Sequence, residues 1–189
     1  MYYLGLDQSL RNTGWSVLSD DPKPHIVDYG CIKSTTEDDY YRRVQNLEHR
    51  LEELLIKWKP EIVFTERVFI PGSKKYNSNS TIHIEFLVHY LLNKQNIKYE
   101  VIESASNIYR GWRRTFNLKS GKNKSKEAIL GFHKDIKITE HIADSMLILA
   151  TGYSLYGPAK FIEFIEDNNT IHHDLAQSVF NRKPVQAYK

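Results

Sequence analysis

The 189-residue sequence is poor in cysteine and has no long apolar run. Because Cys31 is the only cysteine, an intramolecular disulfide and a cysteine-based zinc site are both excluded. No apolar stretch approaches the roughly 20 residues of a membrane-spanning helix, and no charged leader precedes an apolar segment at the beginning. We therefore expect a soluble protein of a reducing compartment, either cytoplasmic or associated with the nucleoid.

The composition is that of a folded domain with a mildly basic surface. Apolar residues make up 41% of the chain, slightly below the usual share for a globular domain, and charged residues make up an ordinary 26%. The formal net charge of +3 permits a nucleic-acid partner without requiring one. The length suffices for one domain with a sizeable core.

Hydrophobic periodicity predicts an α/β domain. The apolar pattern alternates in three short segments, then follows helical spacing up to Pro60, and then becomes a nearly continuous run in "EIVFTERVFI". The order βββαβαβαα indicates a mixed sheet. We expect a domain at 1–158 and an extension of unknown role at 159–189. The predicted strands are 2–7, 14–19, 26–33, 61–70 and 97–103, and the predicted helices are 38–58, 80–95, 123–134 and 139–155.

Three acids occupy positions where an acid is costly unless it is paired or binds metal. Asp7 ends the first strand, Glu66 ends "EIVFTE", and Asp144 lies among apolar residues of "TEHIADSMLILA". Carboxylates from separate elements are what a Mg²⁺-dependent phosphodiester hydrolase requires. The alternatives are a turn or cap for Asp7 and a buried salt bridge to Arg67 or another arginine for Glu66. Gly14 is expected to relax the backbone after the turn that follows Asp7.

Two neighbours of Asp144 are further candidates. Glu140 and His141 flank Asp144 one helical turn earlier. Glu140 can instead be an N-terminal acid that interacts favourably with the helix dipole behind a Thr139 cap. His141 can instead be a partly buried polar contact.

These segments together resemble a known family. "YLGLDQSLRNTGWSVL" is similar to the opening of the RuvC family of Holliday junction resolvases, roughly G-[IL]-D-P-S-L-x-x-T-G, with Gln8 in the place of proline. "FTERVF" resembles the second motif of the family, and "HIADSMLILA" resembles the last. The resemblance covers roughly residues 2–155 and implies the RNase H fold, a mixed five-stranded sheet flanked by helices.

The resemblance also implies a metal site. Asp7, Glu66, His141 and Asp144 would be the catalytic and metal-binding residues, with Glu140 as the fallback ligand. Two Mg²⁺ ions per site are expected, with Mn²⁺ as the alternative. Many relatives have aspartate where this chain has His141, and histidine has a lower preference for Mg²⁺. His141 is therefore also a candidate for positioning the attacking water.

A basic segment is the candidate DNA surface. Residues 104–126 contain seven Lys or Arg and no acid, with aromatic residues interleaved. The alternative is a solvated face with the aromatic side chains in the core. Phe69 matches an aromatic that relatives use near the junction centre, and its alternative is also core packing. The predicted DNA-binding residues are Phe69, Arg113, Arg114, Lys119, Lys122, Lys124 and Lys126.

The function that follows is a metal-dependent endonuclease that resolves four-way DNA junctions by paired symmetric nicks. Family members are homodimers, and the apolar helix 80–95 is our candidate interface. The alternatives are a nuclease for flaps, forks or RNA, and a non-catalytic junction-binding protein. An actin-like ATPase would need a longer chain and glycine-rich phosphate loops, which this sequence lacks.

Overall fold

The computed structural model describes residues 1–22, 24–35, 37–67, 78–102 and 138–157. Within these ranges five strands form one sheet in the order β3-β2-β1-β4-β5. β1 pairs antiparallel with β2, and β2 with β3, whereas β1 and β4 and then β4 and β5 pair in parallel. The predicted mixed five-stranded sheet is confirmed. The strands are β1 (Tyr2–Asp7), β2 (Asn12–Ser19), β3 (His25–Lys33), β4 (Ile62–Glu66) and β5 (Lys98–Ile102).

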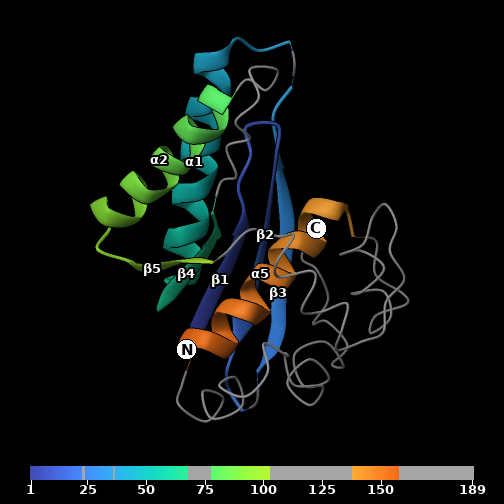
Figure 1. The fold of residues 1–189 in the computed structure, drawn as a ribbon, viewed down its shortest axis with the longest axis vertical. Helices are drawn as coiled ribbons and strands as arrows, with labels where there is room; N and C mark the ends of the chain where they lie inside the picture. Colours follow the sequence, from blue (N-terminus) through green and yellow to red (C-terminus); the bar gives the residue numbers. More distant parts are fainter. Residues whose placement is uncertain (23, 36, 68–77, 103–137, 158–189) are drawn as a thin grey trace.

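Helices cover both faces of this sheet (Figure 1). They are α1 (Tyr40–Trp58), α2 (Ser78–Lys94) and α5 (Glu140–Tyr156). α1 and α2 lie on one face, and α5 lies on the other (Figure 1). No helix in the described ranges is long and apolar enough to cross a bilayer. The helix predicted at 123–134 and the extension at 159–189 lie outside the described residues.

The alternation of side chains along β1 divides the core into two layers. Leu4 and Leu6 pack with α1 and α2, in a cluster that includes Leu51 and Val88. Tyr3 packs on the other face with the residues of α5. Gly5 and Asp7 follow Tyr3 at the same period of two, so both belong to the α5 face. The strand therefore directs its terminal carboxylate towards α5.

Two glycines let α5 lie directly on the sheet. A Cβ on Gly5 would lie 2.4 Å from the Ser145 carbonyl oxygen, and one on Gly14 would lie 1.9 Å from the His141 carbonyl oxygen. The expectation that Gly14 relaxes the backbone is wrong, because Gly14 lies inside β2 and no glycine of the described residues has a positive φ. Its function is steric, since any side chain there would collide with the first turn of α5.

We predict that Gly14→Ala destabilises the fold by about 1–3 kcal/mol, because an added methyl group in this contact forces α5 away from the sheet. The free energy of unfolding in urea measures the effect. Ser16→Ala is the matched control. Ser16 lies two residues further along the same face of β2, is fully buried, and its Oγ finds no hydrogen-bond partner among the described residues. Removing that hydroxyl should leave stability unchanged or raise it. Wild-type stability in Gly14→Ala would show that α5 tolerates a greater distance from β2.

Candidate active site

Two of the predicted acids lie at the same edge of the sheet. The parallel register of β1 and β4 runs to the pair Leu6 and Thr65, and each strand ends one residue later, at Asp7 and Glu66. Phe64 packs with α5, so the period of two gives Glu66 the α5 face as well. Both carboxylates therefore come from adjacent carboxyl ends of parallel strands.

A direct side-chain contact of the site joins β1 to α5. His141 Nδ1 lies 2.7 Å from Asp7 Oδ2, across 134 positions of sequence. The Asp7 side chain is 15% exposed and that of His141 is 38% exposed, so Asp7 is mostly sheltered from solvent whereas the imidazole remains partly accessible. Thr139 caps the helix by accepting a hydrogen bond from the Ile142 amide at 3.3 Å, which places His141 in the first turn.

The charges around His141 favour its protonated form. The hydrogen bond to Asp7 raises the pKa of the imidazole most, and burial opposes this shift by disfavouring the charged ring. The charges of Asp7, Asp144 and Glu140 raise the pKa further. Asp144 and Glu140 are therefore close enough to act on the same ring. Glu140 also lies in the first turn of α5, where a negative charge suits the helix dipole.

The donor set fits a divalent cation in its chemistry. Asp7, Glu66 and Asp144 offer the carboxylate oxygens that Mg²⁺ prefers, and imidazole is also a common ligand of divalent metals. In the described part of the chain, however, no three His, Cys, Asp or Glu side chains are close enough to share one ion. To share one ion, the carboxylates of Asp7, Glu66 and Asp144 would have to lie closer together than they do in this structure, in which Asp7 contacts His141.

One residue of this edge is absent from the predicted set. Gln8 follows Asp7, is only 6% exposed, and donates from Nε2 to the backbone oxygen of Glu66 at 2.7 Å. It therefore ties the end of β1 to the end of β4. The only signal in the sequence is its departure from the D-P-S-L pattern, which gives no hint of a bond between strands.

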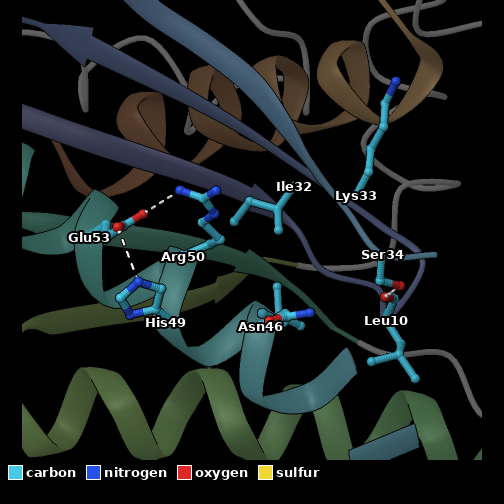
Figure 2. A pocket seen from close by; sticks show the side chains of 9 residues that line it. Leu10, Ile32, Lys33, Ser34, Asn46, His49, Arg50 and Glu53 are labelled. Atoms are coloured by element: carbon cyan, nitrogen blue, oxygen red, sulfur yellow. Dashed lines mark hydrogen bonds and ion pairs between the residues drawn. The ribbon is translucent and has the colours of Figure 1, made fainter. Parts of the chain in front are cut away.

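A separate groove lies on the opposite face of the sheet. Its volume is about 500 Å³. Figure 2 shows Glu53 among the lining side chains, joined by dashed lines to Arg50 and His49. The Glu53 carboxylate lies 2.8 Å from Arg50 and 3.2 Å from His49. Leu10 and Ile32 belong to the core layer of α1 and α2, not to that of α5. The groove is therefore distinct from the carboxylate site. It is lined by Leu10, Ile32, Lys33, Ser34, Asn46, Leu47, His49, Arg50 and Glu53.

The predicted DNA-binding residues are not placed by this structure. Phe69, Arg113, Arg114, Lys119, Lys122, Lys124 and Lys126 all lie outside the described residues. Their contribution to DNA binding stays a prediction.

Comparison with known proteins assigns the family. The family model described as "Crossover junction endodeoxyribonuclease RuvC" matches residues 3–107, more than half of the chain. The chain belongs to the RuvC family. This confirms the resemblance drawn from the motifs at Asp7 and Glu66, both of which lie inside the matched residues.

Curated RuvC relatives match over a limited length. The crossover junction endodeoxyribonuclease RuvC of Orientia tsutsugamushi (strain Boryong) is 36% identical over 83 residues, which are 43% of this chain and 51% of the relative. The chain thus spans about half the length of the relative that it matches.

Solved RuvC structures share the fold over a greater length. Thermus thermophilus RuvC in complex with Holliday junction substrate superimposes with a TM-score of 0.64 at 16% identity, covering 83% of this chain and 97% of that one. The yeast mitochondrial Holliday junction resolvase Ydc2 gives a TM-score of 0.53 at 20% identity, covering 78% and 75%. At these identities the likeness establishes the fold.

We predict that Asp7→Asn lowers the pKa of His141 in the metal-free protein, because Asp7 is the largest cause of its elevation. A raised folded pKa means that this pair stabilises the fold fully below the unfolded value of about 6.5, and that the contribution is lost as the pH rises through the folded value. Titration of the imidazole ring by NMR measures the change.

Asp20→Asn is the control for that titration, because Asp20 pairs with the terminal amine of Met1 at the other end of β1. It should leave the His141 titration unchanged. An unaltered His141 pKa in Asp7→Asn would contradict the hydrogen-bonded pair.

Proposed function

We propose that this protein is a divalent-metal-dependent endonuclease that resolves four-way DNA junctions by paired nicks. One observation carries the proposal: within a RuvC-family chain, Asp7 lies 2.7 Å from His141 of α5 at the strand edge where Glu66 also ends. Asp144, one turn after His141, adds a third carboxylate whose charge reaches the same imidazole. Phosphodiester hydrolysis with metal ions needs such a set from separate elements.

The residues divide into ligands and a polar partner. Asp7, Glu66 and Asp144 would hold two Mg²⁺ ions, or Mn²⁺ in their place. Bound there, the ions would activate the attacking water and stabilise the charge on the leaving oxygen. His141 would leave Asp7 to become a ligand, or stay hydrogen-bonded to Asp7 and position the water. Glu140 is the fallback ligand if His141 takes the second part.

Cations at the same edge support a polyanionic substrate. Arg11 precedes β2, Lys33 ends β3 and Arg67 follows β4, and all three are exposed. These strand ends form the edge that bears Asp7 and Glu66. Positive charge there would offset the repulsion between the acids and the phosphates of the DNA. The basic segment 104–126 and Phe69 would extend this surface.

A stripe on α2 supports a homodimer. Ile82, Phe86 and Tyr90 follow at intervals of four residues and are 38%, 71% and 50% exposed. The rings of Phe86 and Tyr90 stack with centroids 6.4 Å apart. Leu91, the next residue after Tyr90, is only 1% exposed and belongs to the core. An exposed apolar stripe backed by a buried one suits an isologous contact between two α2 helices.

We predict that Asp7→Asn, Glu66→Gln and Asp144→Asn each abolish cleavage of a labelled four-way junction in Mg²⁺ and retain binding to it. Loss of a ligand charge weakens the metal site, while the positive DNA surface is unchanged. Gel assays of cleavage with Mg²⁺ and of binding without it measure the two effects.

Glu100→Gln is the matched control for these variants. Glu100 lies on β5, where Lys98 pairs with it at 3.6 Å, and its loss should leave cleavage intact. Fork, flap and linear duplex substrates in the same assay separate junction resolution from general cleavage of branched DNA. Near wild-type turnover in any one of the three variants would remove that residue from the site. Junction binding by the wild type without cleavage of any substrate would favour the non-catalytic alternative.

We predict that the double variant Phe86→Ser, Tyr90→Ser sediments as a monomer at concentrations where the wild type is a dimer, because it removes the most exposed part of the stripe. Ile56→Ser is the control, since Ile56 is 65% exposed and belongs to α1, not to this stripe of α2. A monomeric wild type that still makes paired cuts would contradict the dimer. If the double variant remained a dimer, the interface would have to lie outside this stripe.

A further inference from the structure

We infer that Gln8 is a positioning residue for the metal site, holding the strand ends that carry Asp7 and Glu66 at a fixed separation. The inference rests on the proposed function, since it concerns the same carboxylates. The starting observation is the 2.7 Å hydrogen bond from Gln8 Nε2 to the backbone oxygen of Glu66.

The bond lies just beyond the regular ladder. Backbone pairing of β1 with β4 runs to Leu6 and Thr65, one residue before each carboxylate. The side chain of Gln8 then reaches across to the residue that bears the second acid. A side-chain amide thus supplies one further link between the two strands just after their backbone pairing ends.

The burial of Gln8 strengthens its hydrogen bond to Glu66 but also costs free energy of folding. Gln8 is 94% buried, since 6% of its surface is exposed. The hydrogen bond is partly buried, and a bond sheltered from water is electrostatically stronger than one in water, so it restrains the two strand ends. Its other amide atom, Oε1, is buried without a hydrogen-bond partner in the part of the chain that the structure describes. A buried polar atom of this kind costs free energy that an apolar side chain would avoid. Folding alone does not favour glutamine here, whereas a site that needs a fixed spacing does.

The fixed spacing matters because the acids must share small, rigidly coordinated ions. Mg²⁺ demands near-octahedral geometry, so a change in the separation of two ligand backbones weakens binding. Groups that orient ligands without touching the ion typically alter metal affinity or activity by 10- to 100-fold. Gln8 binds the backbone of the proposed ligand Glu66 and directly follows the proposed ligand Asp7 in the chain.

The test compares Mn²⁺ binding by the full-length wild type and Gln8→Met, which keeps the length of the side chain and removes both amide atoms. We expect Mn²⁺ affinity, measured by electron paramagnetic resonance without DNA, to fall by about tenfold or more. The thermal unfolding midpoint in chelator should stay at the wild-type value or rise. Junction cleavage should fall at limiting Mg²⁺ and recover as Mg²⁺ is raised.

Ser154→Ala is the matched control. Its buried hydroxyl donates to the Ala150 backbone oxygen at 2.7 Å near the far end of α5, and its loss should leave Mn²⁺ affinity unchanged. A folded Gln8→Met with wild-type Mn²⁺ affinity would overturn the inference. Gln8→Leu is the second variant should the first fail to fold, and failure of both would assign Gln8 to the core and reject the positioning role.

The failure of the proposed function gives a different result. Asp144→Asn is measured alongside, and it should weaken Mn²⁺ binding whether or not Gln8 contributes. If the wild type binds no Mn²⁺, or Asp144→Asn binds it equally well, the metal site itself is wrong and Gln8 has nothing to position.

Discussion

The direct contact of α5 with β1 and β2 is the constraint on which the candidate site depends. At Gly5 and Gly14 no side chain separates the helix from the sheet, and a Cβ on Gly14 would lie 1.9 Å from the His141 carbonyl oxygen. This distance puts the first turn of α5 over the end of β1. The 2.7 Å contact of His141 with Asp7 is its consequence. The sheet supplies two of the acids, and the glycines bring the helix that supplies the third.

The parallel pairing of β1 with β4 provides the second requirement. Parallel strands end at the same edge of a sheet, so acids that close each strand meet without any long loop. The alternation of side chains along each strand then decides the face of the sheet on which a residue lies, and both Asp7 and Glu66 lie on the face that α5 covers. A shift of one residue in either strand would turn its carboxylate towards the core of α1 and α2. The hydrophobic pattern that fixes the register therefore also fixes the site.

The strands, the described helices and the acids could be predicted from sequence because they depend on periodicity and on the placement of charge. Asp7 and Glu66 were found as acids that end apolar runs, and Asp144 as an acid on an apolar helix. The function of Gly14 could not be found, because a close approach of two elements leaves no periodic signal. The bond of Gln8 to Glu66 joins residues 58 positions apart. Nothing in the local sequence of either residue specifies that partner.

The electrostatics of the site connect its metal-free form to its proposed function. The carboxylates of Asp7, Asp144 and Glu140 repel each other unless a cation lies among them. In this structure the imidazole of His141 contacts Asp7, and the charges of Asp7, Asp144 and Glu140 raise its pKa, which favours the protonated ring. A divalent ion bound there would supply positive charge in place of the protonated imidazole. Its binding would therefore compete with the proton on His141. Under the proposed function, protonation of His141 would therefore oppose metal binding as the pH falls.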